Sequence, residues 1–453
     1  MERNLTSGSV FRNILIFSLP YLLSYLLQTL YGMADLYIIG QFGDVSDTTA
    51  VSIGSQVMHM LTVMIVGLAM GATVFVGQAI GGDDPKKAAK GIGNTVTIFM
   101  AVSVVLTVML VVLVKPITAI MATPADAVAG TVDYLTICFI GIPFITAYNV
   151  ISAVFRGMGD SKSPMYFIAV ACAANIGLDV LFMGAFHMGP AGAALGTTLS
   201  QAISVFVSLA VILKRKTGIS LKRTDFRPDR PVMGSILKIG VPVALQDGLI
   251  QIAFIVITVI ANNRGLNDSA AVGIVEKVMS FLFLVPSSML SAVSALGAQN
   301  IGANKPERAI RTLRYAAFLA AGFGCVVAVT VQFLAEPVVS LFTDAATAEG
   351  AEVVRLGGQY LRGYVWDCIF AGIHFCFSGY FCAVGKSGIS FLHNIIAIAL
   401  MRIPGVYLTS ELFPATLLPM GLATASGSII SVVICVIAFT VLMKKAKPNT
   451  VGV

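Results

Sequence analysis

Apolar stretches of about 20 residues recur along the whole chain, and they limit the folds it can adopt. About 20 apolar residues cross the hydrocarbon core of a bilayer as one helix. Of the 453 residues, 57% are hydrophobic and 11% are charged, whereas about a quarter of a soluble domain is charged. The sequence therefore predicts an all-α integral membrane protein with twelve transmembrane helices. The expected spans begin near residues 13, 50, 93, 127, 164, 191, 238, 270, 315, 355, 388 and 416.

The basic residues predict how the chain is oriented in the membrane. Cytoplasmic loops carry an excess of Lys and Arg, and here the loops after even-numbered spans are the basic ones. Both termini are therefore expected in the cytoplasm, in a multi-pass protein of the plasma membrane (the inner membrane of a bacterium). The net charge of +7 is spread over short loops, so we expect no nucleic-acid partner. The residues are Lys86, Lys87, Lys90, Arg156, Lys162, Lys214, Arg215, Lys216, Lys222, Arg223, Arg227, Arg230, Arg308, Arg311, Arg314, Lys444, Lys445 and Lys447.

The two halves of the sequence repeat each other. At an offset of 221 residues, Gln78 aligns with Gln299 and Gly81 with Gly302. Such a repeat of six spans keeps its orientation in the membrane, and parallel repeats are typical of transporters. We expect an N-lobe at 1–213, a cytoplasmic linker at 214–237 and a C-lobe at 238–453. A duplicated scaffold without transport activity is the alternative. The other pairs are Pro85 with Pro306, Pro116 with Pro337, and, with one added residue, Pro20 with Pro242.

Polar side chains inside the N-lobe spans form a candidate ion site. Charges within a bilayer are costly and mark functional sites. Asn175 and Asp179 are four residues apart, so they share a helix face, and Asp35 lies on the first helix. Carboxylate, amide and hydroxyl oxygens suit Na⁺, and paired buried carboxylates also suit H⁺. Structural hydrogen bonds between helices are the alternative for each residue, above all for Thr197 and Tyr134.

Further polar residues are secondary candidates. Pro20 interrupts the hydrogen bonds of the first helix and is expected to bend it. Arg402 is a potential partner for one of the C-lobe acids. For the acids, a structural or interfacial role is equally expected. The secondary candidates are Gln28, Asp247, Glu276, Asp367 and Arg402.

The helix 1 acid Asp35, the loop at 156–160 and several glycine-rich segments together resemble the multidrug and toxic compound extrusion (MATE) family, within the multidrug/oligosaccharidyl-lipid/polysaccharide flippase superfamily. The helix 1 acid Asp35 and the loop Arg156-Gly-Met-Gly-Asp160 are the more specific matches. Glycine-rich segments at 71–81, 189–194 and 297–302 also match, and the resemblance covers nearly the whole chain.

The resemblance implies two six-helix lobes, arranged as a V and related by pseudo-two-fold symmetry. It implies an antiporter that exports drugs or organic cations in exchange for H⁺ or Na⁺, with no cofactor, and we expect a monomer. Family ion-site positions fall on Asp35, Tyr134, Asn175, Asp179 and Thr197. Pro20 matches the proline at which helix 1 bends on protonation in some members.

The resemblance does not extend to a C-lobe ion site. One branch of the family uses a Glu on helix 7 and an Asp on helix 10. Here the segment Leu249-Ile-Gln251-Ile carries no acid, and Asp367 precedes the family position by about one turn. The pattern favours the branch that relies on the N-lobe.

A lipid-linked saccharide flippase and a membrane-embedded enzyme are the alternatives to multidrug export. A lipid-linked saccharide flippase would be expected to carry several basic residues between its lobes, but the basic residues here map to loops. A membrane-embedded enzyme would need a catalytic set, and the sequence has neither metal-ligand spacing nor a Ser/His or Cys/His set. The seven cysteines lie in apolar segments and indicate buried small side chains, so that no disulfide or metal site is expected.

Overall fold

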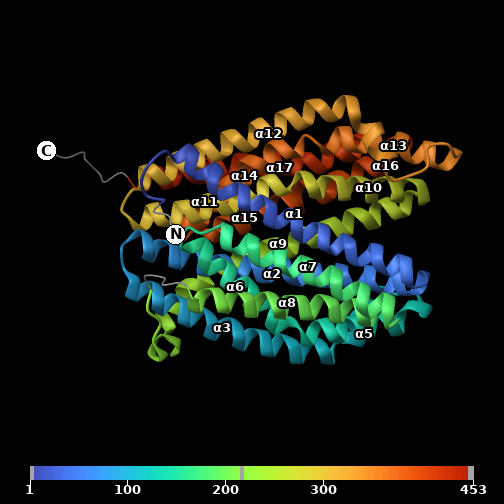
Figure 1. Ribbon diagram of the computed structural model, residues 1–453. Coiled ribbons are helices and arrows are strands. Elements are labelled where there is room, and N and C mark those ends of the chain that lie inside the picture. The colour runs from blue at the N-terminus through green and yellow to red at the C-terminus, as the bar shows by residue number, and fades with distance from the viewer. Residues whose placement is uncertain (1–4, 215–218, 447–453) are drawn as a thin grey trace. The chain divides into compact units, whose positions relative to one another are not determined.

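A computed structural model describes residues 5–214 and 219–446, and these residues form helices and no strand (Figure 1). Within these two ranges, ten helices are long and apolar enough to cross a membrane, or twelve if each of two bent pairs is one span. The predicted all-α membrane fold is confirmed. The helices up to the linker are α1 (Val10–Phe42), α2 (Val45–Gly81), α3 (Pro85–Val112), α4 (Val114–Ile120), α5 (Val128–Ile140), α6 (Ile142–Gly157), α7 (Lys162–Asp179) and α8 (Gly189–Lys214).

In the described chain, nine α-helices follow the linker, where eight precede it. Short 3-10 turns, η1 (Ala125–Ala127) and η3 (Arg223–Phe226), and π-helical turns, η2 (Val180–Ala185) and η4 (Ile398–Arg402), complete the described chain. The helices after the linker are α9 (Arg230–Arg264), α10 (Leu266–Leu282), α11 (Leu284–Gly302), α12 (Pro306–Ser340), α13 (Ala348–Tyr364), α14 (Asp367–Ala383), α15 (Ser387–Ala397), α16 (Ile403–Leu412) and α17 (Leu418–Ala446).

The fourth expected span of each half is a bent pair of helices, which the sequence did not predict. The bend is 48° between Ala125–Ile140 and Ile142–Gly157, and 41° between Ala348–Tyr364 and Asp367–Ala383. The first bend falls at Gly141, where a side chain would collide with Thr198 of α8. Matching bends at corresponding places support the internal repeat. By contrast, α1 continues as one helix through Pro20.

The described residues divide into two compact units. Of these residues, unit 1 comprises 5–8, 15–214, 219–244 and 298–305, and unit 2 comprises 9–14, 245–297 and 306–446. In unit 1, α2 packs against α3, α5 and α6, and α7 packs against α8. In unit 2, α12 packs against α14, and α13 against α17.

The linker is anchored to α3 by hydrogen bonds within unit 1. Asn94 Nδ2 donates to the Asp225 carbonyl oxygen (3.1 Å), and the Asp229 backbone N–H donates to Asn94 Oδ1 (2.8 Å). Lys90 forms an ion pair with Asp229, and its hydrogen bond lowers the pKa of Asp229 below the ordinary value. The linker therefore has a defined position on α3 around these residues.

Repeat-related glycines pack against each other's helices within unit 1. A Cβ on Gly81 would collide with the carbonyl oxygen of Gln299, and a Cβ on Gly302 would collide with that of Gln78. The two pairs that the sequence aligns thus meet in one reciprocal contact. Glycine is needed here because the backbones of α2 and α11 approach too closely for any side chain.

We expect Gly81→Ala to destabilise the protein by about 1–3 kcal/mol, because the added methyl group meets backbone that cannot rotate away. Thermal unfolding of the purified protein measures the effect. The control is Gly32→Ala on α1, where nothing lies within 4 Å of the added Cβ and alanine should stabilise the helix. Equal melting temperatures for the two variants would contradict the expected contact.

Candidate ion-coupling site

Unit 1 brings Asp35 of α1 together with polar residues of α7 and α8. Thr197 Oγ1 donates a hydrogen bond to Asp35 Oδ2 at 3.1 Å, and Asn175 and Asp179 also lie beside the Asp35 carboxylate. All are buried: Asp35 is 3% exposed, Asn175 and Asp179 are 0% exposed, and Thr197 is 8% exposed. Four of the predicted residues therefore form one buried cluster.

Several oxygen and nitrogen atoms of this cluster have no partner. Within the described ranges, Asp35 Oδ1, both carboxylate oxygens of Asp179 and both side-chain amide atoms of Asn175 are buried without a hydrogen bond. Leaving buried polar atoms unsatisfied is costly, more so for charged groups. A bound proton or a small hard cation would satisfy the oxygen atoms of this set, because oxygen atoms are the preferred ligands of such a cation.

Small residues and an irregular backbone allow this close packing. A Cβ on Gly196 of α8 would collide with Asp179 Oδ1, so the Asp179 carboxylate sits directly over a glycine. The π-helical turn η2 begins at Val180, immediately after Asp179. Such turns often occur at functional sites.

Tyr134 lies next to the cluster but bonds elsewhere. Its hydroxyl shares a hydrogen bond with Ser55 of α2 at 3.1 Å. Its ring covers Gly54, where a side chain would collide with it. Tyr134 is 2% exposed and is an electrostatic neighbour of Asp35. It therefore borders the cluster from α5 without a direct hydrogen bond to its carboxylates.

The structure adds Tyr31 and Gln201, which sequence reasoning missed. Tyr31 is an electrostatic neighbour of Asp35, and its hydroxyl lies beside Gln201 of α8. A signal was present, because Tyr31 lies four residues before Asp35 and so shares its helix face. Gln201 likewise lies one turn beyond Thr197 and is buried.

The C-lobe candidates do not form a comparable cluster. Arg402 Nη2 forms an ion pair with Asp367 Oδ2 at 2.8 Å, and its Nε donates to the Thr424 carbonyl oxygen at 3.1 Å. Thr258 Oγ1 donates to Glu276 Oε2 at 3.3 Å. Asp247 lies beside Gln246 on α9. The expectation that Arg402 pairs with a C-lobe acid is met by Asp367, so that acid already has a cationic partner.

The remaining candidate, Gln28, lines a small cavity in unit 1 and lies seven residues before Asp35 on α1.

No group of three or more His, Cys, Asp or Glu side chains among the described residues could hold a metal ion. The Asp35 cluster differs from such a group because two of its four members contribute amide and hydroxyl oxygens.

A duplicated set of apolar helices with buried acids between them defines the class of multi-pass membrane transporters. The chain belongs to the MatE family, whose sequence pattern matches residues 20–181 and 242–408. This family consists of transporters and not of enzymes, which decides against the membrane-embedded enzyme.

Two relatives and one solved structure illustrate the family. "Probable multidrug resistance protein YpnP" of Bacillus subtilis (strain 168) is 29% identical over 423 residues, which are 93% of this chain and 92% of that protein. "Multidrug export protein MepA" of Staphylococcus aureus (strain NCTC 8325 / PS 47) is 26% identical over 411 residues, 90% of this chain and 89% of that protein. A solved structure described as "Crystal structure of MATE in complex with MaL6" matches with a TM-score of 0.89 at 21% identity, covering 97% of this chain and 98% of that one. The similarity to this solved structure shows that the two chains share a fold.

Proposed function

We propose that the chain is a secondary multidrug exporter that expels organic cations or amphiphilic drugs in exchange for H⁺ or Na⁺. The observation that carries this proposal is the set of unsatisfied buried atoms around Asp35, Asn175 and Asp179. Relatives named for multidrug resistance and multidrug export support the substrate class. The coupling ion binds between α1, α7 and α8, with Thr197 as a further oxygen ligand.

Coupling requires the ion and the drug to favour different conformations of one equilibrium. A monovalent ion that reaches the cluster from outside compensates one negative charge of the Asp35 and Asp179 carboxylates and stabilises the conformation that releases drug. The membrane potential supplies about 2.3 kcal/mol per charge per 100 mV for inward cation movement. The exchange therefore needs no cofactor, and a monomer suffices.

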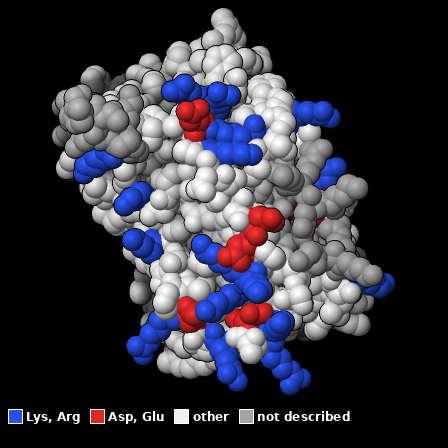
Figure 2. All heavy atoms as spheres, turned by 90° about the vertical axis from the view of Figure 1, so that its left-hand side faces the viewer, with Lys and Arg blue, Asp and Glu red and all other residues white. Residues whose placement is uncertain are grey.

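The proposed orientation has both termini and the 214–237 linker in the cytoplasm, with lobes at 1–213 and 238–453. Figure 2 shows more Lys and Arg side chains than Asp and Glu. Positively charged loops stay on the cytoplasmic side of a membrane, so we place the basic loops in the cytoplasm.

Transport by the purified protein in liposomes tests the coupling and identifies the ion. Ethidium movement is followed by fluorescence under an imposed Na⁺ gradient at equal pH, and separately under a pH gradient without Na⁺. We expect one of the two gradients to drive ethidium against its own gradient. If neither the Na⁺ gradient nor the pH gradient changes ethidium movement relative to liposomes without a gradient, ion-coupled export is refuted.

A lipid-linked saccharide flippase is less well supported. Only two cationic side chains in the described ranges are buried, Arg156 and Arg402, and Arg402 is paired with Asp367. A flippase for anionic lipid-linked sugars would be expected to need several unpaired ones.

A further inference from the structure

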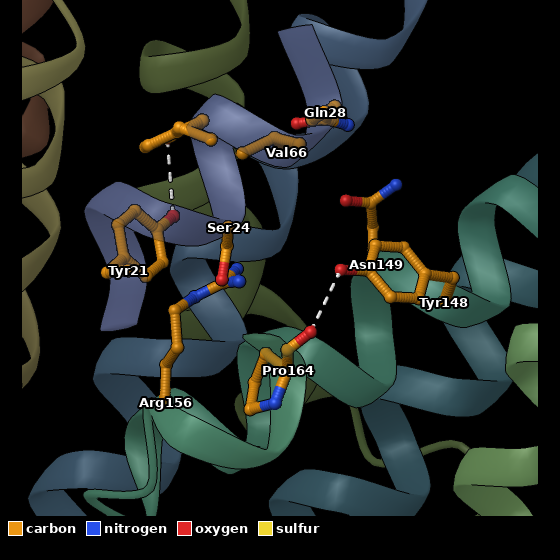
Figure 3. A pocket seen from close by; sticks show the side chains of 9 residues that line it. Tyr21, Ser24, Gln28, Val66, Tyr148, Asn149, Arg156 and Pro164 are labelled. Atoms are coloured by element: carbon orange, nitrogen blue, oxygen red, sulfur yellow. Dashed lines mark hydrogen bonds between the residues drawn. The ribbon is translucent and has the colours of Figure 1, made fainter. Parts of the chain in front are cut away.

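A small cavity in unit 1 lies at the side of the Arg156 guanidinium (Figure 3). Its volume is about 30 Å³, which is room for roughly two waters or for one carboxylate group. Figure 3 shows Arg156 reaching from α6 towards Ser24 of α1. The lining residues are Tyr21, Ser24, Tyr25, Gln28, Val66, Tyr148, Asn149, Arg156 and Pro164.

Arg156 is buried, although its place in the sequence predicted a loop residue. The side chain lies in the last turn of α6 and the residue is 5% exposed, because the helix continues one residue past it to Gly157. Its Nε and Nη2 atoms are buried without a hydrogen-bond partner anywhere in the described chain. Its contact with the Tyr21 ring, 5.2 Å from the centroid, is a cation–π interaction.

The acid nearest in sequence does not neutralise this charge. The Asp160 carboxylate accepts hydrogen bonds from the backbone N–H groups of Lys162 and Ser163, both at 3.0 Å, and from Ser163 Oγ at 2.6 Å. No ion pair to Arg156 occurs within the described ranges. A buried guanidinium without a counter-charge is strongly unfavourable, so the site is suited to an anion from outside the chain.

Two other polar side chains of the cavity already donate hydrogen bonds to backbone carbonyl oxygens. Ser24 Oγ donates to the Pro20 carbonyl oxygen at 2.9 Å, and Asn149 Nδ2 donates to that of Ile145 at 2.8 Å. The Gln28 amide, half-buried on α1, makes no side-chain hydrogen bond to the described residues. Gln28 is therefore a further polar group that lines the cavity and can donate to a bound ligand.

We propose that Arg156 binds the carboxylate of a transported zwitterion, with Gln28 lining the same cavity. The guanidinium fork matches a carboxylate in geometry, and the cavity of about 30 Å³ has room for a carboxylate group. Ser24, towards which Arg156 reaches, lies 11 residues before Asp35 on α1, about 16 Å along the helix. A zwitterion can place its carboxylate at Arg156 with its ammonium group pointing along α1 towards Asp35. This inference rests on the proposed export function.

Binding of norfloxacin and of its methyl ester to purified protein in nanodiscs tests this site. Both probes are fluorescent and both carry an ammonium group, but only the acid has a carboxylate. In Arg156→Gln we expect norfloxacin affinity to fall about tenfold or more, as for the loss of a charged hydrogen bond, and ester affinity to stay within about twofold. Arg156→Lys should lie between Arg156→Gln and wild type, because it keeps the charge and loses the fork.

The control is Arg227→Gln, which removes an exposed arginine of the linker and should bind both probes as wild type does. Equal loss of both probes in Arg156→Gln, or no loss of either, would overturn the site. If Arg156→Gln does not fold, wild type must still bind the acid more tightly than the ester, and Arg156→Lys must reduce that preference; otherwise the site is refuted. Failure of wild type to move either probe under any ion gradient would refute export instead, and the binding comparison would still decide the role of Arg156.

Discussion

Replacing Asp35 with Asn is expected to abolish ion-coupled export while leaving the folded protein in the membrane. Asparagine keeps the size of the side chain and can still accept the hydrogen bond from Thr197, 3.1 Å away in the wild type. It removes the negative charge that a proton or Na⁺ would neutralise. Losing one charged ligand of about 1.5–3 kcal/mol lowers ion affinity roughly 10- to 100-fold. Ethidium efflux from cells that express each variant at equal levels measures the effect.

The matched control is Asp126→Asn in η1, because Asp126 is an exposed acid of the same unit. Its efflux should equal that of wild type. Wild-type efflux in Asp35→Asn would remove Asp35 from the coupling mechanism and leave its bond to Thr197 as a structural contact between α1 and α8.

Replacing Arg402 with Met is expected to destabilise the protein by about 3–5 kcal/mol, because it leaves Asp367 as an unpaired buried charge. Asp367 is 0% exposed, and its Oδ2 accepts from Arg402 at 2.8 Å. The double variant Asp367→Asn/Arg402→Met should recover most of the loss, since neither charge then remains. Thermal unfolding of the purified protein in detergent measures all three proteins.

An exposed ion pair of the same unit provides the control. Arg355 and Glu352 are bonded at 2.6 Å, with side chains 47% and 40% exposed, and removing such a pair costs about 0–1 kcal/mol. Arg355→Met should therefore melt close to wild type. If Arg402→Met melts with it, the Asp367 pair is not a stabilising element of unit 2.

The helix content and the site residues were predictable to different degrees. Apolar length predicted the spans because lipid requires a run of about 20 apolar residues. The bends at Gly141 and after Tyr364 were not predictable, since they depend on what packs against each helix. Spacing placed Asn175 and Asp179 on one face, whereas bringing Asp35 to them depends on the tertiary packing of α1.

Arg156 shows the limit of reading charges along a sequence. It lies near a basic, glycine-rich turn, and its sequence position predicts it to be among the basic residues of the cytoplasmic loops. Whether α6 ends before or after Arg156 depends on the last helical turn, which is the least predictable part of an element. Tyr134 shows the same limit, because its bond to Ser55 depends on a glycine on another helix.

The two π-helical turns have a consequence for how the duplicated halves can diverge. The first directly follows Asp179 and the second ends at Arg402, so each half holds a buried ionisable residue beside the same irregularity. A π turn contains one residue more than an α turn, and in an α-helix one residue corresponds to about 100° of rotation. Deleting a single residue there would re-aim every side chain that follows it. One deletion at such a turn can therefore rotate the rest of the helix, just as one substitution can change a side chain.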